Sequence, residues 1–262
     1  MQDQMYEGKA KILYKTDDKE IFLMHFKDDI TAGDGEKKDT MKNKGSLNCT
    51  ISKKIFEYLE KQRGVHTHYI SSPAKNEQLV KKVEILPVEV VIRNIAAGSI
   101  CRRYGIRKGH VFKTPLLELF YKDDDLHDPL VRDDVVLEME WCTASQLAEI
   151  KRQAHIVHAR MSEYWKSYEL TLVDAKYEFG VTSNGEIVLA DEITPDSQRI
   201  WDKDGASLDK DTFRTGTDMD KVETVYNYIH DLIHADAIEW DKSPHYIIRS
   251  IWIYHISVIF FT

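Results

Sequence analysis

The chain has 262 residues, of which 42% are hydrophobic and 31% are charged, and its formal net charge is -8 at pH 7. This length and apolar content are enough for one large domain or for two closely joined lobes. The acidic balance argues against a nucleic-acid groove, which needs an excess of Lys and Arg.

Strand patterns dominate the first part of the chain. Runs rich in Val, Ile, Leu, Phe and Tyr are typical of strands when turn residues separate them. Such runs lie at residues 9–16, 20–27, 79–86 and 88–94. Pro87, which cannot donate to a sheet ladder, separates the last two. A further run at 170–180 predicts a strand that leads into a hairpin.

Three segments have the apolar spacing of amphipathic helices. The first covers 43–64 and ends at Gly64, the second follows Thr143 and Ser145, either of which can cap it, and the third is the final helix. Their apolar positions are Leu47, Ile51, Ile55 and Leu59; Leu147, Ile150, Ala154, Val157, Met161 and Trp165; and Val222, Val225, Ile229 and Leu232. Because strands come in runs with helices between the runs, the predicted class is α+β.

A hairpin is predicted at Asn184-Gly185, which lies between two apolar runs. This dipeptide favours a two-residue type I′ turn. In that register Glu178 directly faces Asp191, and like charges placed opposite each other repel.

Alternate strand residues share a face, so Asp174, Lys176 and Glu178 point the same way. A divalent cation between Glu178 and Asp191 would remove the repulsion, because Mg²⁺ is usually held by one or two carboxylates together with nucleotide phosphates. The alternative is a solvated polar face on an edge hairpin.

Lysines and arginines next to glycine turns suggest anion binding at three places. Lys9 and Lys11 follow Gly8 and share a strand face, although a plain surface strand with two lysines has the same pattern. Arg93 precedes the small-residue loop that contains Ser99; the alternative for Arg93 is a structural pair with Glu89.

Arg199 follows the turn residues Pro195-Asp196-Ser197, which a capped turn without a ligand also explains.

Several site classes lack support in the sequence. Cys49, Cys101 and Cys142 are few and far apart, without a C-x-x-C pair, so neither a disulfide framework nor a cysteine zinc site is predicted, and a cytoplasmic protein is expected. No G-x-S-x-G elbow occurs. The apolar C-terminal stretch contains Arg249 and His255 and is shorter than the ~20 apolar residues of a membrane span, so no membrane association is expected.

Two long motifs resemble the signatures of one enzyme family. "LPVEVVIRNIAAGS" (86–99) and "LVDAKYEFG" (172–180) resemble those of phosphoribosylaminoimidazole-succinocarboxamide synthase, the SAICAR synthetase of purine biosynthesis. Five shorter stretches match in the same order, so the resemblance runs from Tyr6 to the final helix. They are "YEGKAK", "TAGDGEKK", "KDDDLHDP", "ADEITPDSQRIWD" and "DKDTFR".

The resemblance implies an ATP-dependent ligase that joins L-aspartate to the carboxylate of carboxyaminoimidazole ribonucleotide and releases ADP and phosphate. A carboxylate is a poor acylating agent, so an acyl phosphate intermediate is expected, and this route needs no protein nucleophile. The family fold is a two-lobed α+β structure with antiparallel sheets and ATP between the lobes. We therefore expect a nucleotide-binding lobe at 1–92, a substrate lobe at 93–243 and an atypical tail at 244–262, in a homo-oligomer such as a dimer.

The resemblance also implies roles for single residues. Mg²⁺ and the ATP phosphates would be held by Glu178 and Asp191. Other nucleotide contacts are implied for Lys9, Lys11, Lys81 and the backbone around Leu86. The reacting end would be lined by Asp174, Lys176 and Lys11, and the ribonucleotide phosphate and its neighbours would be bound by Arg93, Ser99 and Arg199. Further substrate contacts, not divided between aspartate and ribonucleotide, would come from Asp34, Lys122, Asp128, Asp196 and Lys210.

Two rival functions share the nucleotide cleft. A small-molecule kinase would also release ADP, but the motif H-R-D-x-x-x-x-N is absent, and "VRDD" at 131–134 lacks its His and Asn. A non-catalytic nucleotide-binding module would bind ATP without turnover, and it gives Arg93, Ser99 and Arg199 no purpose.

Overall fold

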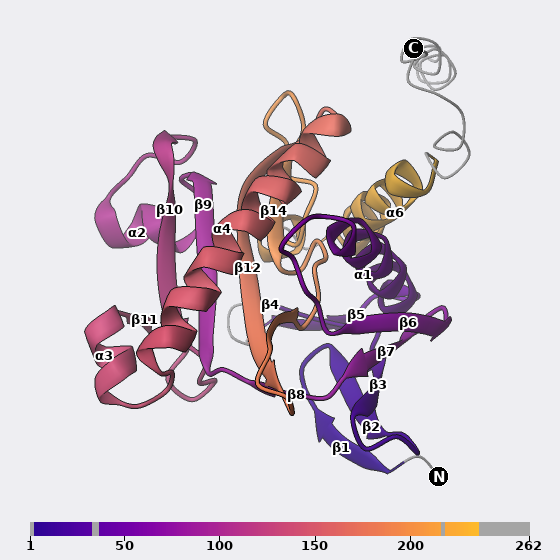
Figure 1. Cartoon of the computed structure of the whole chain (residues 1–262). Helices are drawn as coiled ribbons and strands as arrows, with labels where there is room; N and C mark the ends of the chain where they lie inside the picture. Colours follow the sequence, from indigo (N-terminus) through magenta and orange to yellow (C-terminus); the bar gives the residue numbers. More distant parts are fainter. Residues whose placement is uncertain (1–2, 33–36, 216–217, 236–262) are drawn as a thin grey trace, which may run out of the picture.

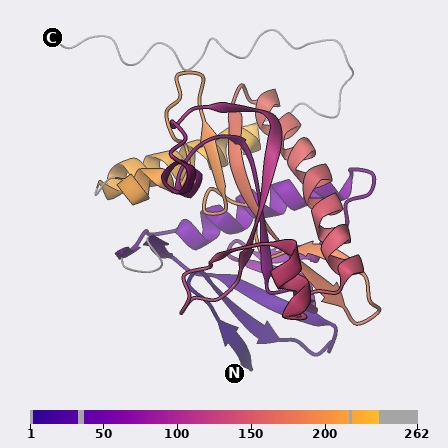
Figure 2. The same ribbon diagram turned by 90° about the vertical axis from the view of Figure 1, so that its left-hand side faces the viewer.

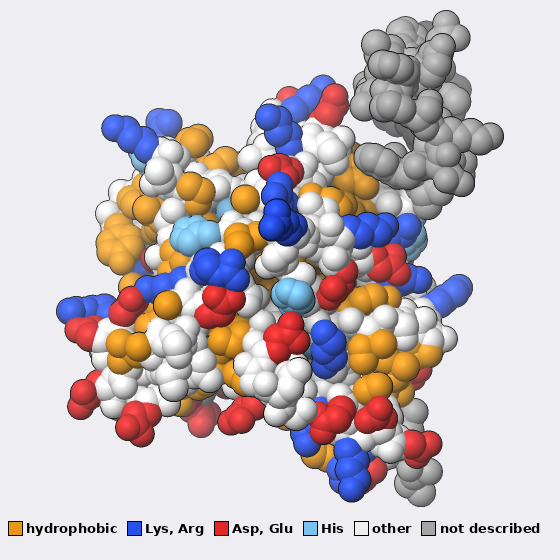
Figure 3. Space-filling model, viewed as in Figure 1, with side chains coloured by type: hydrophobic (Ala, Val, Ile, Leu, Met, Phe, Trp, Pro, Cys, Tyr) orange, Lys and Arg blue, Asp and Glu red, His pale blue; other side chains and the backbone are white. Residues whose placement is uncertain are grey.

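The computed structural model describes residues 3–32, 37–215 and 218–235 (Figure 1). The implied site residue Asp34 and the expected tail at 244–262 lie outside these ranges. Within them, no helix is long and apolar enough to cross a membrane. On the face drawn in Figure 3, Lys and Arg side chains are interspersed with Asp and Glu side chains.

An antiparallel five-stranded sheet forms the N-terminal part of the molecule, with the order β1-β2-β3-β7-β6. Its strands are β1 (Gln4–Glu7), β2 (Lys11–Lys15), β3 (Ile21–Phe26), β6 (Tyr69–Ala74) and β7 (Glu77–Lys81). The strands predicted at 9–16 and 20–27 are confirmed as β2 and β3. Between β3 and β6 in the chain, β4 (Asp29–Ala32) and β5 (Lys37–Thr40) form a separate two-stranded sheet.

The predicted first helix is confirmed as α1 (Lys44–Glu60), which packs on β3, β6 and β7 and also against α6. Figure 2 shows α1 crossing above the N-terminal sheet. Its four apolar residues at four-residue steps are all buried. Gly45 permits the close approach of helix and sheet, because a Cβ there would lie 2.3 Å from the carbonyl oxygen of Phe26. The helix ends at Glu60, before the predicted stop at Gly64.

The second sheet has seven strands, with the main order β11-β10-β9-β12-β13, while β8 and β14 also pair with β12. The strands are β8 (Val83–Ile85), β9 (Val88–Ile95), β10 (Val111–Tyr121), β11 (Leu130–Val131), β12 (Thr171–Thr182), β13 (Ile187–Ala190) and β14 (Gln198–Trp201). The predicted strand at 79–86 is therefore divided. Its first residues form the end of β7 in the five-stranded sheet, and its later residues form β8 in the seven-stranded sheet.

Helices cover the second sheet and complete the core. The long helix α4 (Ala144–Ser167) packs on β9, β12 and β13. Thr143 caps it by accepting a hydrogen bond from the Gln146 backbone, and the Gln146 side chain completes a capping box. The remaining helices are α2 (Ser99–Tyr104), α3 (Asp133–Glu138), α5 (Asp211–Thr215) and α6 (Met219–Ala235). The α+β class is confirmed, whereas the lobe boundary near residue 92 stays a prediction.

The predicted hairpin register is wrong by one residue. Thr182 N donates to Glu186 O at 2.9 Å, which leaves a three-residue loop. Gly185 has a positive φ of 84°, but Asn184 does not, so the turn is not type I′. The Thr182 hydroxyl accepts a hydrogen bond from Glu186 N at 3.1 Å and stabilises the longer loop. As a result Glu178 faces Ala190 instead of Asp191.

Candidate active site

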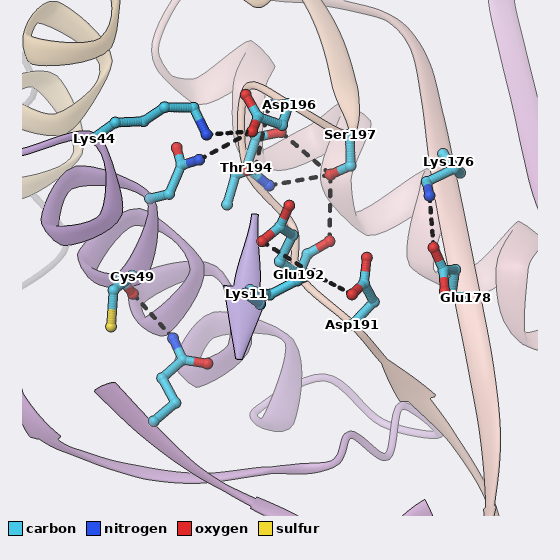
Figure 4. A network of polar contacts seen from close by, with 12 residues as sticks. Lys11, Lys44, Cys49, Lys176, Glu178, Asp191, Glu192, Thr194, Asp196 and Ser197 are labelled. Atoms are coloured by element: carbon cyan, nitrogen blue, oxygen red, sulfur yellow. Dashed lines mark hydrogen bonds and ion pairs between the residues drawn. The ribbon is translucent and has the colours of Figure 1, made fainter. Parts of the chain in front are cut away.

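The loop 191–197 leaves the second sheet beside the middle of β12. Residues 178–181 of β12 pair with β13, and residues 171–175 pair with β14, so the loop between these two strands passes the intervening part of β12. The backbone N–H of Lys176 donates to Ser197 O at 2.8 Å and ties the loop to the strand. Figure 4 shows the polar network that results.

At one end of this region, β12 contributes Asp174 to an arginine cluster, which we define as Arg93, Arg103, Arg199, Arg214, Glu118, Asp174 and Asp211. Asp174 accepts hydrogen bonds from Arg93 at 2.5 Å and from Arg199 at 2.9 Å. Four guanidinium groups meet these three carboxylates, and the charge of the neighbouring Asp209 also acts on Arg199. Guanidinium groups are common partners of phosphate and carboxylate groups, so this cluster is a candidate anion site.

Arg93 is held on three sides. Its Nε donates to Glu118 at 2.6 Å, one Nη to Asp174 and the other to the Ser99 hydroxyl at 3.2 Å. The alternative for Arg93, a structural pair with Glu89, is wrong. Arg93 pairs with Glu118 and Asp174, and Glu89 instead accepts a hydrogen bond from Lys176 at 2.7 Å.

Gly98 lets Arg199 approach the loop before α2. Its φ is +65°, and a Cβ at this position would lie 2.5 Å from an Nη atom of Arg199. Any other residue would therefore be strained and would displace the guanidinium group. Carboxylates hold Arg199 on its other side, and they raise its pKa against the effect of burial.

Further along β12, Glu178 lies in a cluster with Glu89, Lys122 and Lys176. Its carboxylate accepts hydrogen bonds from Lys176 at 2.5 Å and from Lys122 at 2.6 Å. Burial alone would raise the pKa of Glu178, but the two ammonium groups outweigh it and lower this pKa below its ordinary value. Burial raises the pKa of Glu89, which Lys176 offsets only in part.

Across the site, Lys11 of β2 contacts both Asp191 and Glu192. Burial disfavours the charged amine, but Asp191, Glu192 and Glu178 together raise the pKa of Lys11. Glu192 Oε2 forms an ion pair with Lys11 Nζ at 3.1 Å. This oxygen is buried and accepts no hydrogen bond. Burial is also the main reason why the pKa of Glu192 is raised.

The backbone brings Asp191 to this cluster. In a regular strand, Asp191 would point away from the face of Glu178, because the facing residue Ala190 precedes it by one. Asp191 instead adopts a φ of 61°, which ends the alternation. The charge of Asp191 also raises the pKa of Lys176, so both carboxylates act in one electrostatic field. Lysines therefore offset the charges of Glu178 and Asp191 in the metal-free protein.

The donor set of Glu178 and Asp191 fits Mg²⁺, which prefers hard oxygen ligands. Glu192, the next residue after Asp191, contributes a buried oxygen that lies against Lys11 and has no hydrogen bond. Among the residues that the structure describes, no group of three or more His, Cys, Asp or Glu side chains forms a ready metal site.

Asp196, at the tip of the loop, contacts other protein groups. Its carboxylate lies 2.6 Å from Lys44 Nζ and 3.3 Å from Asn48 Nδ2, and it accepts a hydrogen bond from the Tyr226 hydroxyl. Lys210 lies near this carboxylate; burial lowers the pKa of Lys210, and the charge of Asp196 offsets this effect only in part.

The other implied site residues lie in several places. Lys9 contacts Asp124 at 2.9 Å on an exposed surface, and Lys81 donates to Thr67 O at 3.0 Å. Leu86 is buried between β8 and β9, where its N–H donates to Phe179 O at 2.9 Å. Asp128 has a φ of 47° and accepts a hydrogen bond from Asp123 N at 3.0 Å.

Sequence reasoning missed Lys44, Asn48, Glu118, Glu192 and Tyr226. One signal was present: Lys44 and Asn48 lie at i and i+4 on α1, next to its apolar stripe. Residues at that spacing share a helix face, and both prove to be buried. For the other three, the contacts join segments far apart in the chain.

Comparisons with known proteins agree with this fold. The model of the SAICAR synthetase family matches residues 4–230. Phosphoribosylaminoimidazole-succinocarboxamide synthase from Staphylococcus carnosus is 47% identical over 231 residues, which cover 87% of this chain and 98% of that protein.

Two solved structures are similar over nearly their whole length. The crystal structure of the enzyme of that name from Ehrlichia chaffeensis has a TM-score of 0.85 and 39% identity, and the match covers 89% of this chain and 99% of that one. A SAICAR synthetase in complex with ADP has a TM-score of 0.83 and 39% identity, with 92% and 99% covered.

The molecule thus has an α+β fold similar to that of these synthetases, with lysines, arginines and carboxylates clustered along β12. Since the family model spans most of the chain and a relative is 47% identical over almost its whole length, the chain belongs to the SAICAR synthetase family.

Proposed function

We propose that this protein is an ATP-dependent ligase of purine biosynthesis. It joins L-aspartate to the carboxylate of carboxyaminoimidazole ribonucleotide and gives SAICAR, ADP and phosphate. Family membership supports the reaction class, and the similar SAICAR synthetase in complex with ADP supports the use of adenine nucleotides. The observation that carries this proposal is one face of β12, where Asp174 belongs to the arginine cluster and Glu178 pairs with Lys176 and Lys122.

The proposed chemistry has two steps. A carboxylate oxygen of the ribonucleotide attacks the γ-phosphorus of ATP; the new O–P bond forms as the bond to the β-phosphate oxygen breaks, and ADP leaves. The aspartate amine then attacks the acyl carbon, the C–N bond forms, and phosphate leaves with that carboxylate oxygen while the amine loses a proton. The protein contributes positioning and charge neutralisation.

The ATP phosphates are assigned to the cluster of Lys11, Glu178 and Asp191. Lys11 is partly buried, and neighbouring carboxylates keep it charged, so it can approach phosphate oxygens as a point charge. When bound, Mg²⁺ would neutralise phosphate charge, and Glu178 and Asp191 are the residues that would hold it. Lys9, two residues before Lys11, and Lys81, at the end of β7, are proposed as further nucleotide contacts, and the backbone at Leu86 as the adenine-side hinge.

The ribonucleotide phosphate is assigned to the arginine cluster. Arg93 and Ser99 are already in contact, and Arg199 lies against Gly98, so the groups are ordered before an anion binds. Each guanidinium group can present paired N–H donors to phosphate oxygens.

Asp174 and Glu178 are four residues apart, or about 13 Å along a strand, with Lys176 between them. Asp174 and Lys176, with Lys11, would then line the reacting end. The role of Asp128 in substrate binding, and that of Lys122, stay proposals.

A coupled assay of ADP release tests the function. Release is expected only when ribonucleotide, L-aspartate, ATP and Mg²⁺ are all present. Equal turnover without aspartate would indicate a kinase instead, and ATP binding without turnover would indicate a binding module.

A further inference from the structure

A buried charged network holds the loop between the two proposed substrate regions. The Lys44 side chain is 1% exposed and that of Asp196 is 7% exposed, and they lie 2.6 Å apart. Asn48 donates to the same carboxylate oxygen, and the Tyr226 hydroxyl donates to the other one. Burial of a charged pair costs free energy that the pairing offsets only partly, so stability alone is a weak reason for such a pair.

The network connects three distant parts of the chain. Lys44 and Asn48 lie in the first two turns of α1, Tyr226 lies in α6, and Asp196 lies in the loop 191–197. Figure 4 shows Lys44 reaching Asp196 from the helix, while Asp191 and Glu192 lie at the start of the same loop, beside Lys11 of β2. Both helices are therefore tied to one point of the loop.

That point is the tip of an ordered turn. Ser197 N donates to Thr194 O at 3.0 Å, and Asp196 N donates to the Thr194 hydroxyl at 3.2 Å. Ser197 O in turn accepts the backbone N–H of Lys176. A displacement of Asp196 would thus be transmitted to the backbone beside β12.

The two ends of the same loop carry the proposed site residues. Asp191 and Glu192 lie at its start against Lys11, and Arg199 follows its end against Asp174. The loop therefore sets the spacing between the proposed phosphate-transfer region and the proposed ribonucleotide region.

We propose that Lys44, Asp196 and Tyr226 form a positioning anchor, and that Asp196 acts through this anchor and not by contact with L-aspartate. The inference rests on the proposed function. In it, the ribonucleotide carboxylate must be held roughly 3–3.5 Å from the γ-phosphorus, and a misplacement of about 1 Å can reduce the rate about 100-fold. Loss of the anchor should therefore reduce kcat, whereas both substrates keep their direct contacts and their KM values.

The test compares Asp196→Asn, Lys44→Met, the double variant K44M/D196N and Tyr226→Phe by aspartate-dependent ADP release. Matched controls are Lys53→Met on α1, where the side chain is 39% exposed, and Tyr228→Phe on α6, where the residue is 47% exposed. Thermal unfolding of each variant identifies those that fail to fold. If Lys44→Met does not fold, the double variant, which leaves no unpaired buried charge, and Tyr226→Phe still test the proposal.

We expect Asp196→Asn to lower kcat about 10- to 100-fold and Tyr226→Phe to lower it several-fold, with KM for aspartate and ribonucleotide changed less than about threefold. Because Lys44 and Asp196 act as one unit, the double variant should be no slower than Asp196→Asn alone. Both controls should match the wild type.

A rise of tenfold or more in KM for aspartate in Asp196→Asn, absent from Tyr226→Phe, would overturn the inference and indicate direct substrate contact. Unchanged kcat in folded Asp196→Asn would overturn it equally. An inactive wild-type protein would instead refute the proposed function, so the two failures are distinguishable.

Discussion

Glu178→Gln separates two accounts of the carboxylates near β12. If Glu178 and Asp191 repelled each other in the metal-free protein, removal of one charge would stabilise it. In the structure, however, Glu178 is 3% exposed and pairs with Lys176 and Lys122 at 2.5 and 2.6 Å. Removal of its charge leaves two ammonium groups with one fewer partner, so the variant should be less stable.

The magnitude follows from the contacts that remain. Loss of one partner of a buried pair costs about 3–5 kcal/mol. Lys176 keeps Glu89 at 2.7 Å, and the Lys122 side chain is 39% exposed, so the lower end of about 3 kcal/mol applies. For a chain of this size, about 2–4 °C per kcal/mol gives a decrease in Tm of about 6–12 °C.

Thermal unfolding of the metal-free and nucleotide-free protein measures this decrease. The control is Glu186→Gln at the turn of the same hairpin, where the side chain is 39% exposed and contacts only His66, at 3.4 Å, among the ion pairs of the described residues. Its effect should stay within about 0.5 kcal/mol. With Mg²⁺ and ADP at about 100 times Kd, the wild type should gain about 2.7 kcal/mol and Glu178→Gln clearly less. An unchanged or higher Tm of the metal-free variant would refute this reasoning.

Three further changes test other parts of the site and core. Arg199→Ala should raise KM for the ribonucleotide at least about tenfold, since charged hydrogen bonds contribute about 1.5–3 kcal/mol. Steady-state kinetics measure this change; a rise in KM for ATP instead would contradict the assignment of Arg199 to the ribonucleotide. Gly98→Ala should lower thermal stability and weaken ribonucleotide binding, measured by calorimetry, because its Cβ would displace Arg199 at a φ of +65°; wild-type affinity would argue against this contact. Burial lowers the pKa of His158 to about 3, so the folded protein keeps it neutral while the unfolded chain binds a proton below about pH 6.5. The free energy of unfolding should therefore fall with decreasing pH. Between about pH 7.5 and about pH 4.5, urea unfolding should show a loss about 3 kcal/mol greater in the wild type than in His158→Gln; an equal loss in the two proteins would contradict this prediction.

Local patterns were sufficient for much of the fold. The four-residue spacing from Leu47 to Leu59 predicted α1, and Thr143 was one of two predicted caps of α4, because helix periodicity and capping are local properties. The exact hairpin register was not predictable from Asn184-Gly185. The Thr182 hydroxyl favours a loop one residue longer, and one residue is enough to change which side chains face each other.

Prediction of the site was limited by contacts between segments that lie far apart in the chain. The motifs pointed to Asp174, Lys176 and Glu178 on one face, and the structure has them in contact with the arginine and lysine clusters. Neither the positive φ at Asp191 nor the buried Lys44–Asp196 pair could be derived, because both depend on contacts between distant segments.

The most direct test of the account follows a carboxylate oxygen. Carboxyaminoimidazole ribonucleotide labelled with ¹⁸O in its carboxylate is incubated with the protein, ATP, Mg²⁺ and L-aspartate, and the released phosphate is analysed by mass spectrometry. An acyl phosphate intermediate predicts one ¹⁸O atom in each phosphate. Unlabelled phosphate, formed together with SAICAR, would contradict the proposed mechanism.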